Sequence, residues 1–445
     1  MTGRSCLACL ALACASLGAT PPGDDTAALQ LAIDALPRGG TLVLEARTYH
    51  FQGLRLPRSA SVIGRGAGRT LCVRTAAAPF FRISGRDAEV AIRQLDLDGG
   101  GLCAAGIEAD GVRTLRLDGV RVAHCGTPPP GSLPGDAHGK PVDGVYARDV
   151  DRAEVSHCLF QANARDGFIG IPVRRLFFAH NTSRDNGRMG CTSDLDPEGR
   201  LGGPLQVVYQ DNEVVACGTG GLHVESAPGL PVVDARFEGN RVTGCGDRDW
   251  GYSWGLVLGR NGQGALRGNT VTATGLKSSL RDYRNGILVA RPGGPVVIAD
   301  NTIQGSGRSG IAVSESAFPV ILSRDTVRGA LASGIAAYRL SALKVEGCTV
   351  EGSGQWGFWC RLCPSARVLG NRFLGNGLEL PGSYAAMRAE ASADLSLKDN
   401  DLGGPPQSMG LELQDNLLGA FTHLEGNTFQ GQRRHPRLSS FLASN

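Results

Sequence analysis

A glycine followed by an apolar residue recurs along most of this chain at nearly constant spacing. Steps of 23 residues lead from Gly144 to Gly167 and on to Gly190, and a step of 24 residues leads from Gly286 to Gly310. Further members of the series are Gly106, Gly221, Gly255, Gly334, Gly357 and Gly410. So short a repeat cannot bury its apolar face alone, and neighbouring repeats must therefore stack and share one interior. The period predicts a solenoid of at least ten turns.

A second landmark keeps the same register. Asn181, Asn212 and Asn301 each lie nine residues before the next glycine of the series, and Asp325 and Cys348 take the same place in their repeats. Asparagine tolerates a left-handed turn, and its side chain can hydrogen-bond from one turn of a solenoid to the next. The recurrent asparagine therefore indicates an internal ladder rather than a ligand site.

The segment after each glycine alternates as a strand does. Its first and third residues are apolar or small, as in Val145/Ala147 and Ile287/Val289, and should point inward. Its second and fourth residues should then point to solvent. Parallel strands joined by crossover connections are right-handed in nearly all proteins. The predicted fold is therefore all-β: a single-stranded right-handed parallel β-helix with an N-terminal capping helix.

The N-terminus has the composition of an export signal. Residues 1–19 contain one arginine, a short apolar run and small residues suited to cleavage. No later run approaches the ~18 apolar residues of a membrane span. We therefore expect a secreted or periplasmic product without a transmembrane segment. The expected divisions are a signal peptide at 1–19, an N-terminal cap at 20–70, the β-helix at 71–430 and a C-terminal tail at 431–445.

The cap carries a resemblance. After a helix predicted from about Asp25 to Leu36, the sequence continues as PRGGTLVLEARTYHF and LRLPRSASVIGRGAG. This stretch resembles the N-terminal cap of the pectate-lyase-like β-helix superfamily, which includes polygalacturonases, pectate lyases, phage tailspikes and epimerases. The resemblance implies the β-helix fold and a polysaccharide partner. A net charge of only +3 argues against a basic field for nucleic acid.

Insertions in the repeat predict where function is concentrated. Three of them precede the strands at Gly144, Gly255 and Gly286, and a fourth follows Asp194. Long loops on a solenoid gather on one binding face, so the turns between residues 136 and 285 should form a trough. The predicted substrate-binding residues there are His138, Lys140, Arg148, Asp194, Glu225, Trp250, Tyr252, Trp254, Lys277, Arg281 and Arg284.

Asp143 and Asp166 precede their glycines on successive turns, so their backbones should lie ~4.8 Å apart. Carboxylates that close either share a proton or hold a cation between them, which makes Ca²⁺ a candidate cofactor at this pair. Asp-Gly is also a common turn pair. The pattern resembles the polygalacturonase family, in which such aspartates protonate the leaving oxygen and activate water. The matching positions would make the chain an inverting glycoside hydrolase.

A different chemistry is favoured by the other residues of the trough. A polysaccharide lyase or C5-epimerase removes the proton beside a uronate carboxylate and needs a tuned base with basic side chains around it. We predict Tyr146 and His223 as the acid and base of such an enzyme. The hydrolase that uses Asp143 and Asp166 remains an alternative, as does a noncatalytic glycan-binding envelope protein. Cys217 and Cys245 share one register, which would allow a disulfide after export.

Overall fold

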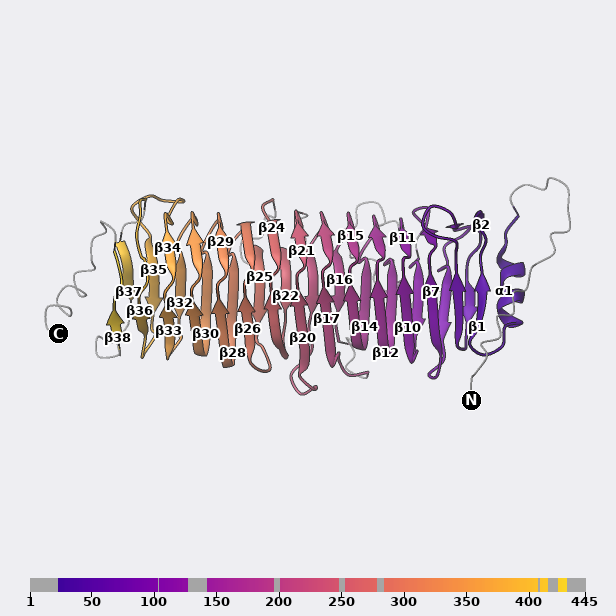
Figure 1. The fold of residues 1–445 in the computed structure, drawn as a ribbon, viewed down its shortest axis with the longest axis horizontal. Helices are drawn as coiled ribbons and strands as arrows, with labels where there is room; N and C mark the ends of the chain where they lie inside the picture. Colours follow the sequence, from indigo (N-terminus) through magenta and orange to yellow (C-terminus); the bar gives the residue numbers. More distant parts are fainter. Residues whose placement is uncertain are drawn as a thin grey trace, which may run out of the picture.

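The computed structural model describes residues 23–102, 104–126, 142–195, 201–247, 253–277, 284–406, 409–414 and 423–429. In these ranges the chain coils into one long parallel β-helix of about 13 turns, seen lengthwise in Figure 1. All paired strands run parallel, as the glycine period predicted. The predicted export signal and the predicted C-terminal tail, residues 431–445, lie outside the described residues. Among the described residues, no helix has the length and apolar character to span a lipid bilayer.

Each turn contributes strands to three stacks. The first stack, here called the first face, contains the strands that follow the recurrent glycines. Its members are β3 (Leu54–Leu56), β6 (Phe81–Ser84), β9 (Ile107–Asp110), β16 (Met189–Ser193), β19 (Gly220–Val224), β22 (Ser253–Leu258), β25 (Arg284–Ala290), β32 (Phe358–Arg361), β35 (Ala385–Glu390) and β37 (Met409–Gln414). Four longer strands begin on this face and bend onto the second: β12 (Val145–Ser156), β14 (Phe168–Ala179), β28 (Ile311–Ser323) and β30 (Ile335–Glu346).

The two other stacks complete the coil. The second face adds β1 (Gly40–Val43), β4 (Ala60–Ile63), β7 (Glu89–Arg93), β10 (Thr114–Asp118), β17 (Gln206–Gln210), β20 (Val233–Glu238), β23 (Gly262–Arg267), β26 (Val296–Ala299), β33 (Ala366–Leu369), β36 (Ser396–Lys398) and β38 (His423–Glu425). The third is β2 (Thr48–His50), β5 (Leu71–Val73), β8 (Asp96–Asp98), β11 (Arg121–Ala123), β13 (Leu159–Gln161), β15 (Thr182–Arg184), β18 (Glu213–Val215), β21 (Arg241–Thr243), β24 (Thr270–Thr274), β27 (Thr302–Ser306), β29 (Thr326–Arg328), β31 (Thr349–Glu351) and β34 (Arg372–Leu374).

A single helix caps the N-terminal end (Figure 1). It is α1 (Thr26–Asp34), slightly shorter than predicted, and it buries Leu29 and Ile33 on one side. Asp25 occupies the position before the first helical residue, but its carboxylate does not cap the helix. That carboxylate instead accepts a hydrogen bond from the backbone N–H of His50 at 2.8 Å, which ties the cap to β2.

Close approach between turns explains the glycine landmark. A Cβ atom added to Gly144 would lie 2.4 Å from the carbonyl oxygen of Gly167, and one added to Gly167 would lie 2.6 Å from that of Gly190. Any side chain would collide with the backbone of the next turn. The strands that follow have the predicted alternation, because Val145, Ala147 and Ile287 are fully buried in the shared core.

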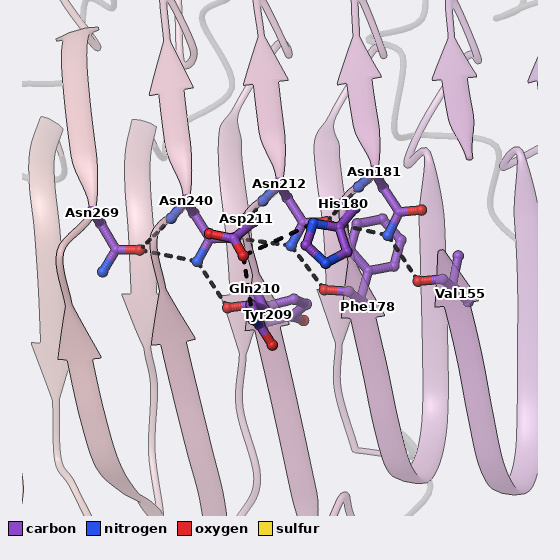
Figure 2. A network of polar contacts seen from close by, with 10 residues as sticks. All are labelled: Val155, Phe178, His180, Asn181, Tyr209, Gln210, Asp211, Asn212, Asn240 and Asn269. Atoms are coloured by element: carbon purple, nitrogen blue, oxygen red, sulfur yellow. Dashed lines mark hydrogen bonds and ion pairs between the residues drawn. The ribbon is translucent and has the colours of Figure 1, made fainter. Parts of the chain in front are cut away.

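The recurrent asparagines form the predicted ladder (Figure 2). The side-chain oxygen of Asn212 accepts hydrogen bonds from the backbone N–H and the side-chain amide of Asn181, at 3.0 and 3.2 Å. Its own amide donates to the carbonyl of Phe178 at 2.8 Å and to the side chain of Asn240 at 2.9 Å. The same contacts continue through Asn240, Asn269 and Asn301 to Asp325. Every turn in this column thus satisfies a buried backbone N–H of its neighbour.

A second polar column runs five residues further along each turn. Asn163 accepts from the backbone N–H of Cys125 at 3.1 Å, and Asn186 accepts from that of Asn163 at 3.2 Å. Cys217 and Cys245 continue this column. Their equal register is confirmed by the pairing of Val215 with Thr243, two residues earlier. Both are free, buried thiols, so the disulfide that their register would allow is not formed in the structure.

Candidate active site

The outward side of the first face carries one dense group of polar side chains. We call it the central cluster and define it as Asp194, His223, Glu225, Trp254 and Arg260. Asp194 follows β16 and Glu225 follows β19, the neighbouring strand, and the N–H of Glu225 bonds to the carbonyl of Ser193 at 3.0 Å. The structure therefore brings together Asp194, His223, Glu225 and Trp254, four of the residues predicted from sequence.

His223 is held from several sides. Its Nε2 atom lies 3.3 Å from Oε2 of Glu225, and its ring stacks on that of Trp254, with centroids 6.1 Å apart and planes 24° apart. From inside the coil, the hydroxyl of Tyr209 donates to the His223 carbonyl at 2.7 Å. His223 is only 8% exposed, so the prediction that this strand position faces open solvent is wrong here. The reason is that a stacked indole and a carboxylate cover the ring.

The two carboxyl groups of the cluster have opposite electrostatic surroundings. Burial alone would raise the pKa of Glu225, but His223 and Arg260 lower it below its usual value, and the Arg260 Nε atom lies 2.5 Å from its carboxylate. Burial raises the pKa of Asp194, and the neighbouring Glu225 adds to this, although His223 opposes it. His223 thus contacts a carboxylate that stays ionised, and the neighbouring strand carries a carboxyl that gains protons more readily. Such divergent pairs divide acid from base roles in active sites.

The structure places Asp143 and Asp166 differently from the prediction. Both are fully buried in the turn before the first face and do not line the trough. Oδ1 of Asp143 accepts the backbone N–H of Asp166 at 3.0 Å, and Oδ1 of Asp166 accepts that of Met189 at 3.0 Å. The pair is therefore a third polar ladder. In these two turns the residue before the glycine points inward, as strict strand alternation would place it.

Their charges are balanced by two arginines. Arg188 forms a two-pronged ion pair with Asp166, at 2.7 and 2.5 Å, which lowers the pKa of that carboxyl although burial works against it. Arg165 approaches Asp143 only to 3.9 Å, and burial raises the pKa of Asp143 to about 6. Both oxygens of Asp166 are thus committed to a guanidinium, while Oδ2 of Asp143 has no hydrogen-bond partner in the described structure.

This arrangement does not fit a calcium ion. Ca²⁺ takes 6–8 oxygen ligands, whereas the Asp143 and Asp166 pair offers one uncommitted oxygen beside two arginines. Within the described ranges, no group of three or more histidine, cysteine or acidic side chains is arranged to hold a metal. We derive no step through a metal.

A column of arginines along the edge of the first face was not recognised from the sequence. Arg165, Arg188, Arg284 and Arg308 each lie two residues before a recurrent glycine, and only Arg284 was predicted. The backbone N–H of Arg188 bonds to the carbonyl of Arg165 at 2.9 Å, and that of Arg308 to Arg284 at 2.7 Å. The two pairs lie on either side of the turns that carry His223 and Trp254. Their common place in the repeat was the signal that could have revealed them.

Tyr146 lies on the same face but not in the central cluster. It is equivalent to His223 in its strand, yet β14 and β16 lie between β12 and β19. Three strand spacings of ~4.8 Å separate the two residues by roughly 14 Å. The structure therefore does not bring together the predicted acid and base. Tyr146 is half-buried, which raises its pKa, and Arg148 points outward on the same strand.

The remaining predicted residues lie at the edges of this region or outside the described structure. Lys277 is exposed and pairs with Asp247 at 3.0 Å, so its charge is largely compensated. Outside the described ranges are the tips of the four insertions and with them His138, Lys140, Trp250, Tyr252 and Arg281.

The comparisons with known proteins agree on the fold. A family model described as "Right handed beta helix region" matches residues 254–433. No curated protein sequence matches the chain. Among solved structures, the tailspike protein 3 of bacteriophage CBA120 is similar over 94% of this chain and 60% of its own, with 11% identity and a TM-score of 0.52.

Two epimerases are also among the similar structures. The A-module of the Azotobacter vinelandii mannuronan C-5 epimerase AlgE4 aligns over 93% of this chain and 95% of its own, with 16% identity and a TM-score of 0.31. The periplasmic alginate epimerase AlgG aligns over 89% of this chain and 82% of its own, with 12% identity and a TM-score of 0.43. No activity follows from similarities this distant. The coil of parallel strands has the architecture of a right-handed parallel β-helix, and the family model matches its C-terminal part, with no single enzyme family matched.

Proposed function

We propose that the first face binds a uronate-containing polysaccharide and that the central cluster transfers protons at a sugar ring, as a lyase or a C5-epimerase does. The observation that carries this proposal is His223 flanked by two carboxyl groups of opposite pKa shift on neighbouring strands. The arginine column beside the cluster adds positive charge along this edge of the face, although Arg165 and Arg188 are paired with Asp143 and Asp166, and such charge favours an acidic substrate.

His223 is the proposed base. Glu225, kept ionised by Arg260, orients the imidazole through the 3.3 Å contact at Nε2. The base removes the proton from the carbon that bears the uronate carboxylate, and the electron pair left behind is delocalised into that carboxylate. In a lyase this pair then forms the C4–C5 double bond while the C4–O bond breaks, and the leaving oxygen takes a proton. In an epimerase a proton returns from the opposite side of the ring.

Asp194 is the proposed acid. Its raised pKa favours a proton-carrying form, and its strand neighbours that of Glu225, so that both carboxyls can reach one sugar ring. Tyr146 lies roughly 14 Å from His223, three strand spacings away, and we assign it to the binding of a more distant sugar.

A second candidate, hydrolysis, is favoured by the same two carboxyl groups. Glycosidases use an acid with a raised pKa and a second, ionised carboxylate. In this structure Asp194 and Glu225 meet that description, whereas Asp143 and Asp166 are enclosed and bound to arginines. If the protein is a hydrolase, its acid and its ionised carboxylate are therefore Asp194 and Glu225 of the central cluster.

One assay separates these possibilities. The protein is incubated with polyuronates and with a neutral glucan, and three signals are followed: ultraviolet absorbance of unsaturated uronate, new reducing ends, and sugar configuration by NMR. Loss of His223 in His223→Ala or of the acid in Asp194→Asn should reduce turnover by ~100-fold or more. Tyr146→Phe is the comparison, and it should raise KM more than it lowers kcat.

Each outcome has a consequence. Reducing ends without unsaturated product would favour the hydrolase. Full activity in both His223→Ala and Asp194→Asn would refute the assignment of the site. Binding of polyuronate without any chemical change would make the chain a glycan-binding protein.

A further inference from the structure

A second group of aromatic side chains lies further along the first face. We call it the aromatic platform and define it as Trp356, Trp359 and Tyr384. The rings of Trp356 and Trp359 stack with centroids 6.3 Å apart and planes 25° apart, and Tyr384 meets Trp356 edge-on at 5.1 Å. All three are partly exposed. The insertions predicted function only between residues 136 and 285, and this group lies beyond that region.

Charged side chains fix the rings in place. The guanidinium of Arg388 lies over the Trp356 ring, 4.9 Å from its centre, and pairs with Glu390 at 2.5 Å and with Glu412 at 3.3 Å. The indole N–H of Trp359 donates to Glu390 at 3.2 Å. Rings held this way lose little conformational freedom when a ligand stacks on them, and this preorganisation favours binding.

The platform is continuous with the central cluster. Trp359 occupies on β32 the position that His223 occupies on β19, and β22, β25, β28 and β30 lie between them. Five strand spacings of ~4.8 Å put the two residues roughly 24 Å apart. The equivalent residues in between are uncharged and aliphatic: Val257, Leu288, Ala312 and Ala336. A linear ligand lying along the face would meet no charge and no aromatic ring in this column.

A loop borders the platform in the same way as the insertions border the trough. Ala386 takes the place of the recurrent glycine in its turn, and Asn371 is the ladder asparagine that precedes it by fifteen residues. The usual spacing between these two positions is nine residues, as from Asn301 to Gly310, so this turn contains an insertion. The extra residues precede β35, just as the earlier insertions precede β12, β22 and β25. Leu378 and Leu380 of this loop are 54% and 57% exposed.

We propose that the aromatic platform is a distal subsite that stacks on sugar rings of the same polysaccharide chain that the central cluster transforms. Indole rings stack on the apolar C–H face of a pyranose, and the hydroxyls around that ring find partners in Arg388 and Glu390. Arg361, exposed beside the platform and 3.5 Å from Glu390, is placed to meet a sugar carboxylate. The platform thus selects long chains over short ones. The identity of the ligand as a uronate polymer rests on the proposed function, but stacking on sugars does not.

The test uses oligogalacturonates and oligomannuronates of increasing length as probes, with binding measured by calorimetry. Trp359→Ala should weaken the binding of chains long enough to reach the platform, about six sugars or more, by about tenfold. For the shortest chains, the variant and the wild-type protein should bind with nearly the same affinity. Trp359→Phe should recover part of the loss. Phe177→Ala is the matched control, because this aromatic residue is 42% exposed on the second face. It should leave binding unchanged at every length.

The failure of this inference is distinguishable from that of the proposed function. A length-dependent loss of binding in Trp359→Ala supports the platform even if no polyuronate is transformed. Equal affinity of Trp359→Ala and wild type for every length overturns it, even if the central cluster proves catalytic. If the wild-type protein binds neither uronate series, the measurement is repeated with neutral glucan oligosaccharides of the same lengths, and failure to bind these as well overturns the platform. If Trp359→Ala does not fold, Trp359→Phe decides by the same length dependence.

Discussion

Asp325 interrupts the asparagine ladder with a group that titrates. It is fully buried and accepts two hydrogen bonds from Asn301, at 2.9 and 2.8 Å, through Oδ1. Its other oxygen has no hydrogen-bond partner in the described structure, at the place where each asparagine carries a donating amide. The next residue of the column is Cys348, whose thiol, a weak donor, bonds to the carbonyl of Glu346 instead. Burial therefore raises the pKa of Asp325 from 3.8 to about 6.

The stability of the protein should depend on pH through this residue. A carboxyl group whose pKa is higher in the folded than in the unfolded protein stabilises the fold at pH values below its pKa in the unfolded protein. This stabilisation is lost as the pH rises through the pKa that the group has in the folded protein. A rise from 3.8 to about 6 corresponds to about 3 kcal/mol. We expect Asp325→Asn to be more stable than the wild type by about 3 kcal/mol above pH ~6, and the gain should vanish below pH ~4.

The measurement is urea denaturation followed by circular dichroism, repeated from about pH 4 to about pH 8. Solenoids do not always unfold in one step, so equal transition slopes are required before midpoints are compared. Asp300→Asn is the control. It removes the same charge from an exposed aspartate in the preceding turn, next to Asn301, that pairs with Arg324 at 2.7 Å, and it should show no gain that grows with pH. A pH-independent difference between Asp325→Asn and wild type would refute the reasoning.

Two further predictions concern the buried groups beside the first face. Arg188→Met leaves the carboxylate of Asp166 buried without its partner and should destabilise the fold by ~3 to 5 kcal/mol at neutral pH. In thermal denaturation, the double variant Arg188→Met/Asp166→Asn should recover most of this lost stability, because no buried charge is then left unpaired. Stability that did not change in the single variant would contradict the role of the pair. Cys217 and Cys245 are buried thiols, so neither should react with an aromatic disulfide reagent until the protein is unfolded. For Cys245, the hydrogen bond with Cys217 and burial also raise the pKa of the thiol, which further slows its reaction. Rapid labelling of either cysteine in the native protein, located by mass spectrometry, would show that the coil opens there.

The features that the sequence determined are those repeated in every turn. The glycine column follows from the close approach of backbones at Gly144 and Gly167, and the ladder at Asn212 follows from a buried N–H that must be satisfied in each turn. Because the same constraint recurs at one spacing, the period alone predicted the parallel coil and the inward residues of its strands. It also placed Asp194, His223 and Glu225 in neighbouring positions.

The features that only the tertiary structure decided depend on partners from other turns. Asp143 and Asp166 have the spacing of a catalytic pair, but their direction is set inside the turn, where backbone N–H groups and Arg188 enclose them. The aromatic platform joins residues from different positions of the repeat, Trp356, Trp359 and Tyr384, so no single landmark of the sequence marks it. A period fixes which residues are stacked, because backbone pairing repeats. It does not fix where a side chain in a turn points, because this depends on the charges and hydrogen bonds that it meets after the coil has formed.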